Sequence, residues 1–259
     1  MDRGPERALR DRLLAVMDQK DHWAWPHFTR PGLSREQLLV HFRHEYLVYV
    51  RDFPVLLARA LGVVPPIEEV RRALAENVYE EQTGGLSGSA PHPELFLRMM
   101  EGMGYRRADF ADDDASLHPS ARAYRDLLRA QSVMSPWQAA VAVLTIFVEG
   151  SRNERAELAG TFRRPKGEEA VRKHPLVVHY GCPTSAMQLV RAHGDVEGSH
   201  RDDAWRMVLG HVEDDSELAR VVVLECERAL AAWHRPRRRR GAHGAAARAR
   251  GLIRPQGNA

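Results

Sequence analysis

Cysteine is scarce in this sequence. The 259 residues contain only Cys182 and Cys226, with no Cys-x-x-Cys pair and no beginning that resembles a signal peptide. Disulfide frameworks and thiolate metal sites need more cysteines at regular spacing. We therefore expect a protein of the reducing cytoplasm, without disulfide bonds.

Long hydrophobic runs are also lacking. The longest apolar stretch, Ala139 to Val148, is about half the length that a membrane-spanning helix needs, and Glu149 ends it. Alternation of apolar and polar residues between hairpin turns is absent, and so are internal repeats. These absences exclude a membrane partner and a β fold, and they leave a soluble all-α protein as the expectation.

Acidic residues are missing from the last segment, residues 235–259. This segment carries eight of the 38 Lys and Arg residues, so the rest of the chain has 30 basic against 35 acidic residues. Arg, Gly and Ala dominate it, and such a composition buries too little apolar surface to offset the entropy of ordering. We expect a disordered Arg-rich tail. Without a basic surface elsewhere to extend Arg237 to Arg240, we do not expect a nucleic-acid partner.

Helical periodicity runs through nearly all of the remaining chain. With 44% hydrophobic residues, residues 1–234 can bury the core of one large domain. We expect a bundle of about seven to eight helices, two of which have N-terminal signals: Ser34 with Gln37, and Ser135 with Pro136 and Gln138. The helices are expected near residues 5–20, 34–61, 67–82, 92–102, 119–131, 135–149, 184–212 and 215–234.

Three residues of the seventh expected helix have the spacing of metal ligands. His193, Glu197 and His200 follow one another at intervals of four and three. At about 100° per residue they fall within roughly 60° of one helix face, so two imidazoles and a carboxylate converge. The alternative is an ordinary polar helix face. Gly194 and Gly198 each cost roughly 1 kcal/mol in a helix, which favours a special role or marks a break.

Two other places in the sequence could complete such a site. Glu80 and Glu81 end one helix and His92 opens the next, although a solvated helix end capped by His92 would give the same pattern. Glu149 follows an apolar run, where a buried carboxylate needs a metal or another partner, unless it reaches solvent or pairs with Arg152. Nitrogen and carboxylate ligands without thiolate suit iron or manganese better than structural zinc.

The ordered set of these residues resembles a known family. The sequence is similar to the heme-oxygenase-like diiron oxidases and oxygenases in four features. These are Glu81 in an Asn-x-x-Glu-Glu segment, His92 in a His-Pro-x-Leu helix start, Glu149 in an apolar helix, and the late His-x3-Glu-x2-His motif. These are iron-containing redox enzymes related to the thiaminase II and pyrroloquinoline quinone synthase folds. The resemblance runs from about residue 30 to 234. It implies a heme-oxygenase-like bundle with these ligands: Glu81, His92, Glu149, His193, Glu197 and His200.

One position departs from the family pattern. The family usually has aspartate where this chain has Glu197, which makes Asp195 a rival ligand. Asp195 lies about 200° around the helix from His193, so helical geometry prefers Glu197. At the first corner, Glu80 remains a possible substitute for Glu81.

The resemblance implies that two Fe(II) ions activate O2 to oxidise a small metabolite. The substrate would be amino-acid-like, an amine or fatty-acid-like, and the reaction N-oxygenation, desaturation or C–C cleavage in specialised metabolism. A redox partner or reductant and a homodimer are further expectations. The residues that we expect to contact substrate are Tyr46, Trp137, Tyr180 and Arg152. Tyr49, His179 and Arg43 are further candidates, although aromatic residues at helical spacing are also typical of plain core.

Two other classes of function remain open from the sequence. The same fold could act without metal, as a thiaminase II-like hydrolase or a cofactorless quinone-synthase-like oxidase. The hydrolase needs a nucleophilic cysteine, for which only Cys182 lies in a loop. A non-catalytic helical binding protein would explain the Arg-rich tail but not the six placed ligands.

Overall fold

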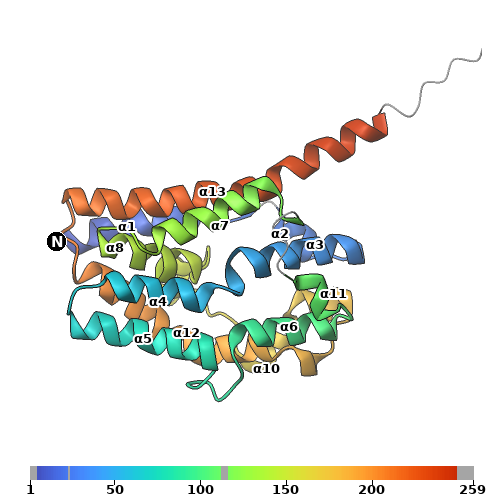
Figure 1. The fold of residues 1–259 in the computed structure, drawn as a ribbon, viewed down its shortest axis with the longest axis horizontal. Coiled ribbons are helices and arrows are strands. Elements are labelled where there is room, and N and C mark those ends of the chain that lie inside the picture. The colour runs from blue at the N-terminus through green and yellow to red at the C-terminus, as the bar shows by residue number, and fades with distance from the viewer. Residues whose placement is uncertain (1–4, 23, 112–115, 250–259) are drawn as a thin grey trace, which may run out of the picture.

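The computed structural model describes residues 5–22, 24–111 and 116–249, and the side chains of these residues except 5–8, 195–199 and 235–249. Every regular element in these ranges is a helix, so the expected all-α class is confirmed (Figure 1). The elements of the N-terminal half are α1 (Pro5–Asp18), α2 (Trp25–Phe28), α3 (Arg35–Glu45), the π-helix η1 (Tyr46–Val50), α4 (Phe53–Val63), α5 (Glu68–Thr83), α6 (His92–Gly102), the 3-10 turn η2 (Arg107–Phe110) and α7 (Pro119–Gln131).

The C-terminal half contains more short helices. Its elements are α8 (Trp137–Val141), the π-helix η4 (Ala142–Val148), α9 (Glu154–Leu158), α10 (Gly167–Lys173), α11 (Pro175–Tyr180), the 3-10 turn η5 (Thr184–Ala186), α12 (Gln188–Leu209) and α13 (Glu217–Ala249). Within the described ranges there are thirteen α-helices, more than the seven to eight expected. The additional ones are α2 and α9 to α11, and the expected helix 34–61 is divided.

The division of helix 34–61 has a cause in the sequence. Pro54 has no N–H and its ring clashes with the preceding turn, so it is tolerated only in the first turn of a helix. The chain accordingly runs from α3 into η1 and starts again as α4 at Phe53, with Pro54 in the first turn. The capping box at Ser34 is confirmed, since the Ser34 hydroxyl accepts from the Gln37 N–H and the Gln37 side chain accepts from the Ser34 N–H.

The expected cap at Ser135 is wrong. Helix α8 begins at Trp137, Pro136 occupies the N-cap position, and no side chain caps the helix. At the other end of the chain, α13 continues through Ala249, so the boundary expected at residue 234 is not a helix end. Figure 1 shows the last turns of α13 leaving the bundle. The disorder expected for residues 235–259 stays a prediction.

Two hydrophobic cores hold the helices together. The first core joins α1, α4, α5, α7, α8, η4 and α13 with the C-terminal half of α12, around such side chains as Leu13, Leu57 and Phe147. The second core joins α2, α3, α6, η2, α10 and α11 with the start of α12, around Leu47, Leu95 and Met100. The π-helix η1 contributes to both, through Val48 and Leu47. No described helix is long and apolar enough to cross a membrane.

Candidate metal centre

The donors of the candidate site come from four helical segments. Glu81 lies in the last turn of α5, and His92 is the first residue of α6. Glu149 follows η4 directly. His193 and His200 both lie on α12, which is helical throughout this interval, as the spacing predicted.

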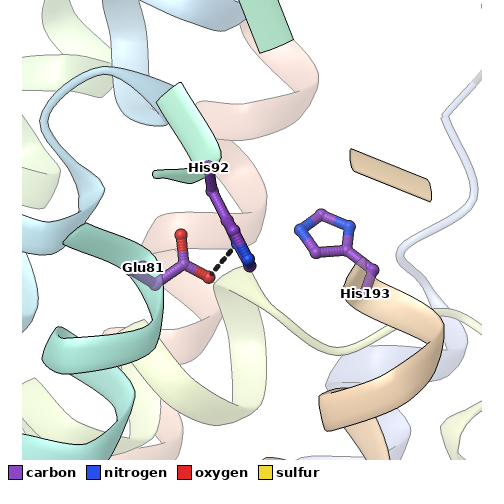
Figure 2. A group of neighbouring side chains, drawn as sticks. All are labelled: Glu81, His92 and His193. Atoms are coloured by element: carbon purple, nitrogen blue, oxygen red, sulfur yellow. Dashed lines mark hydrogen bonds and ion pairs between the residues drawn. The ribbon is translucent and has the colours of Figure 1, made fainter. Parts of the chain in front are cut away.

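Glu81, His92 and His193 form a compact group. One ligand atom from each lies within 4.8 Å of the other two. The Glu81 Oε1 atom is 2.9 Å from His92 Nδ1, and the His92 and His193 rings meet in a T-shaped arrangement with centroids 4.9 Å apart (Figure 2). This is a candidate metal group of one carboxylate and two imidazoles, as His–carboxylate metal sites require.

Glu80 has a different surrounding from Glu81. It is fully buried, and its carboxylate accepts from the backbone N–H groups of Leu86 and Ser87 and from the Ser87 hydroxyl. Its Oε1 atom also lies 3.1 Å from His92 Nε2. Although burial raises the pKa of Glu80, these hydrogen bonds hold it below its usual value. Glu80 is thus committed to the loop between α5 and α6, whereas Glu81 faces the metal group.

The pKa of His92 shows the effect of both carboxylates. Burial alone would lower it, but Glu81 and then Glu80 favour the protonated imidazole and raise the pKa above its ordinary value. In the absence of a metal these carboxylates therefore stabilise a proton on the ring. A metal ion would take the place of that positive charge.

The carboxylate of Glu149 accepts a hydrogen bond from a buried amide. Asn77, one turn before Glu81 on α5, donates from Nδ2 to Glu149 Oε1 at 2.7 Å. Asn77 is buried, and its Oδ1 atom has no hydrogen-bond partner. Arg152, the expected alternative partner of Glu149, pairs with Asp21 instead at 2.8 Å, with both side chains more than half exposed.

His200 carries a buried nitrogen without a hydrogen-bond partner, Nε2. Burial lowers the pKa of His200, so the neutral imidazole is favoured. A neutral ring with an unsatisfied buried nitrogen costs free energy unless another group binds it. A metal ion is the natural acceptor of that lone pair.

These donors surround one cavity of about 230 Å³. Five of the six expected ligands line it, namely Glu81, His92, Glu149, His193 and His200. The sixth, Glu197, and its rival Asp195 lie outside the residues whose side chains are described. The remaining walls are Tyr49, Val50, Phe53, Val148 and Leu189, which belong to or pack against both hydrophobic cores. The cavity thus opens where the two cores meet.

The presence of glycine at position 194 on α12 has a structural explanation. A Cβ atom there would lie 3.1 Å from the backbone nitrogen of Gly167 and 3.6 Å from the Lys166 Cα atom. The start of α10 therefore approaches the backbone of α12 beside His193. The special role that the sequence suggested for Gly194 is therefore a close approach of another segment of the chain.

The structure does not bring the four expected substrate contacts to the cavity wall. Tyr46 is buried against Phe96 and Phe110 in the second core, and Trp137 packs on His211. The Tyr180 hydroxyl donates to the carbonyls of His27 and Arg30, and Arg152 pairs with Asp21. Tyr49 does line the cavity, with its hydroxyl donating to Glu45 at 2.5 Å. Val50, Phe53, Val148 and Leu189 were not identified from the sequence, because apolar wall residues look like any core residue.

Cys182 does not have the surroundings of a nucleophile. It is buried beside Met187, and burial raises the pKa of its thiol to about 11. It also does not line the cavity. A thiol with such a pKa is protonated at neutral pH and reacts poorly, which disfavours a thiaminase-like reaction.

The comparisons with known proteins give the family and the fold of the chain. Residues 40–234 match the model of a family described as iron-containing redox enzymes, and the chain belongs to that family. Among solved structures it is similar to a TenA homolog from Pseudomonas syringae pv. tomato str. DC3000, with 15% identity, a TM-score of 0.64 and 88% of each chain covered. That likeness confirms the thiaminase II type of fold. No curated protein matches the chain.

Proposed function

We propose that this protein is a non-haem diiron oxidase or oxygenase that uses O2 to oxidise a small metabolite. The observation that carries the proposal is the convergence of Glu81, His92, Glu149, His193 and His200 on one cavity in a chain of an iron-containing redox family. The unsatisfied Nε2 atom of His200 supports it, because a metal would supply the missing partner. Five nitrogen and carboxylate donors fit iron.

The residues around the donors keep them oriented. If the proton of His92 is on Nε2, it is donated to Glu80, and the Nδ1 lone pair beside Glu81 is available to a metal. Asn77 holds the carboxylate of Glu149. We include Glu197 as the sixth ligand, because α12 is helical from His193 to His200 and keeps the one-turn spacing. Bound iron would supply the O2-activating chemistry.

The apolar walls of the cavity bear on the kind of substrate that it could hold. Val50, Phe53, Val148 and Leu189 shield the donors from bulk water and leave room for the apolar part of a substrate. We propose an amino-acid-like, amine or fatty-acid-like substrate and N-oxygenation, desaturation or C–C cleavage, in specialised metabolism. O2 chemistry of this kind draws electrons from a redox partner or reductant. A homodimer in the cytoplasm completes the proposal.

The first test is to load the purified protein with Fe(II) without air, count the iron, and follow absorbance after mixing with O2 and candidate substrates. Near two irons per chain, and a transient visible absorbance that one substrate class enhances, would support the proposal. Failure to retain iron, together with no O2-dependent transient, would contradict it and favour the metal-free relatives.

Replacing the donors provides the matching variant test. His200→Ala and Glu149→Ala should each lower the retained iron to one ion per chain or less and abolish O2-dependent turnover, since each removes a donor that no neighbour replaces. His211→Ala and Glu69→Ala are suitable controls, because these two side chains pair with each other at 3.4 Å and do not line the cavity. Iron content should be measured on folded protein. Equal iron loss in donor and control variants would argue against the assigned ligands.

A further inference from the structure

Lys20 binds backbone carbonyls of the turn that carries Glu149. It lies two residues after the end of α1, and its Nζ atom donates to the carbonyls of Phe147 at 2.5 Å, Val148 at 3.0 Å and Gly150 at 2.6 Å. An ammonium group has three N–H donors, so this set uses all of them. The carbonyls stand where η4 ends, and helix ends leave such acceptors without partners.

These contacts fix the backbone on both sides of Glu149. Two of the bonded carbonyls precede Glu149 and the third follows it, so rotation of the turn breaks hydrogen bonds with Lys20. The fit is close at Gly150, where a Cβ atom would lie 2.3 Å from the Ile146 carbonyl oxygen and 2.7 Å from Met17 Cε. Met17 belongs to α1 as well. The C-terminal end of α1 is therefore built against this turn.

Glu154 supplies the opposite charge. It is 1% exposed and accepts from Trp205 Nε1 at 3.0 Å. Burial lowers the pKa of Lys20 to about 7, and the negative charge of Glu154 opposes this shift and favours the ammonium form. Trp205 lies on α12, in the same helix as His193 and His200. Lys20 and Glu154 thus connect α1, the Glu149 turn and the helix that carries two of the donors.

A second, smaller cavity also borders Glu149. It measures about 30 Å³ and lies on the other side of Glu149, between that residue and a charged cluster with Arg164, Arg201 and Glu154. Glu149 lines both cavities. The two guanidinium groups attract a carboxylate, although both also contact Glu157. Because Glu149 borders both cavities, the position of its backbone decides how its carboxylate is shared between the metal donors and these arginines.

We propose that Lys20 is a positioning residue, which holds the backbone of the turn so that Glu149 stays in place at the metal cavity. The inference rests on the proposed function for its metal, but the hold on the turn is a property of the metal-free protein. Asn77 binds the carboxylate of Glu149, whereas Lys20 binds backbone carbonyls on both sides of Glu149 in the chain. The side chain and the backbone of this residue are thus held by separate contacts.

The test compares Lys20→Met, which keeps the length of the side chain without its donors, with Leu13→Ala. Leu13 is a buried α1 residue of the first core, so its variant destabilises α1 and that core in general. Hydrogen–deuterium exchange of the metal-free proteins should show faster uptake in residues 146–154 for Lys20→Met, with uptake in α7 unchanged. Fe(II) affinity of Lys20→Met, measured by anaerobic equilibrium dialysis, should fall at least tenfold. Leu13→Ala should instead raise uptake in α7 as well as in residues 146–154, because both segments pack in the first core.

Lys20→Arg is the second variant in case Lys20→Met does not fold. Arginine keeps the positive charge but carries it on a planar guanidinium group, whose donors are arranged differently from those of an ammonium group. Deuterium uptake and Fe(II) affinity should therefore lie between those of wild type and Lys20→Met. Unchanged uptake in the Lys20 variants, or uptake that rises in α7 as it does in Leu13→Ala, would overturn the inference. If the wild-type protein binds no iron, the proposed function fails by itself, and the exchange data still decide whether Lys20 holds the turn.

Discussion

Asn77 shows how much of the site depends on a single side chain that is not itself a ligand. It is buried, donates to Glu149 and lies one turn from Glu81. The sequence placed it in the segment that carries the family resemblance, but nothing in the sequence connected it with Glu149, 72 residues later. Such a contact depends on how α5 and η4 pack, which local patterns do not specify.

Asn77→Leu should weaken iron binding about tenfold, because Glu149 loses the hydrogen bond that orients its carboxylate. Such a hydrogen bond contributes about 1 to 2 kcal/mol. The protein should remain folded, since leucine keeps the number and branching of the side-chain heavy atoms and the unpartnered Oδ1 atom disappears. Fe(II) dialysis and thermal unfolding of the same samples test this. Glu76→Gln, on the exposed side of α5, is the control. Wild-type affinity in Asn77→Leu would show that Glu149 needs no such support.

Cys182 is expected to be unreactive in the folded protein. Because burial raises its pKa to about 11, the thiolate is scarce at pH 8, and a thiol reagent should modify it far more slowly than a free cysteine. Cys182→Ser should leave iron binding unchanged. Mass spectrometry of native and urea-unfolded protein measures the modification. Rapid labelling of Cys182 in the native protein would restore it as a candidate nucleophile.

Glu80 and Glu81 mark the limit of prediction at this scale. The residue types and order were sufficient to predict that one of them faces the site. Only the loop between α5 and α6 distinguishes them, because the backbone N–H groups of Leu86 and Ser87 bind Glu80 and leave Glu81 to the cavity. A loop rich in glycine and serine has no periodicity from which this geometry could be predicted.

At the scale of elements, sequence signals worked best where they are local. The ligand spacing on α12 and the capping box at Ser34 need only one turn of helix to be correct, and both are present in the structure. The π-helices η1 and η4 could not be predicted, because they have the same apolar composition as an α-helix. Residues 150–183 form short helices that lack a full apolar stripe and contain no strong start signal.

Ser34→Ala should lower the free energy of unfolding by about 1 kcal/mol, the usual cost of losing an N-cap. Both hydrogen bonds of the capping box depend on this position, one through the hydroxyl and one through the Gln37 side chain that it orients. Urea unfolding followed by circular dichroism measures the change. Ser185→Ala, at an exposed position in η5, should change stability by less than about 0.5 kcal/mol. An effect no larger than this control would show that the box contributes little.

For the whole molecule, Asp52 connects the junction of η1 and α4 with α7. Hydrogen bonds from Arg51, and then from Arg129, lower the pKa of Asp52 to about 2 despite its partial burial. In the unfolded chain this pKa returns to about 3.9. The carboxylate therefore contributes stability above about pH 4, and this contribution is lost as the pH falls from about 4 to about 2.

Asp52→Asn should cost about 2 kcal/mol at pH 6 and much less near pH 2. Urea unfolding of both proteins at a series of pH values measures the difference, and it should shrink as the pH falls. Asp126→Asn is the control, because Asp126 is largely exposed. A difference that does not depend on pH would show that the ion pairs do not act through the charge of Asp52.

The fold class followed from the sequence as a whole. Helical periodicity and the lack of strand patterns predicted an all-α chain, and the ordered donors predicted the iron-containing redox family that the family model confirms. The junction of the two cores could not be predicted. It arises from packing between segments far apart in the chain, and with it come the cavity walls that the sequence did not identify.

The order of the donors along the chain has a consequence for the synthesis of the protein. Glu81 and His92 precede His193 and His200 by roughly a hundred residues, and ribosomes add about 5 to 20 residues per second. The first donors therefore leave the ribosome several seconds before the last ones exist. An ion that arrives in this interval meets two donors, or three once Glu149 has been added, rather than a complete cavity. Metal loading is thus expected to follow translation, when α12 has packed against the earlier helices.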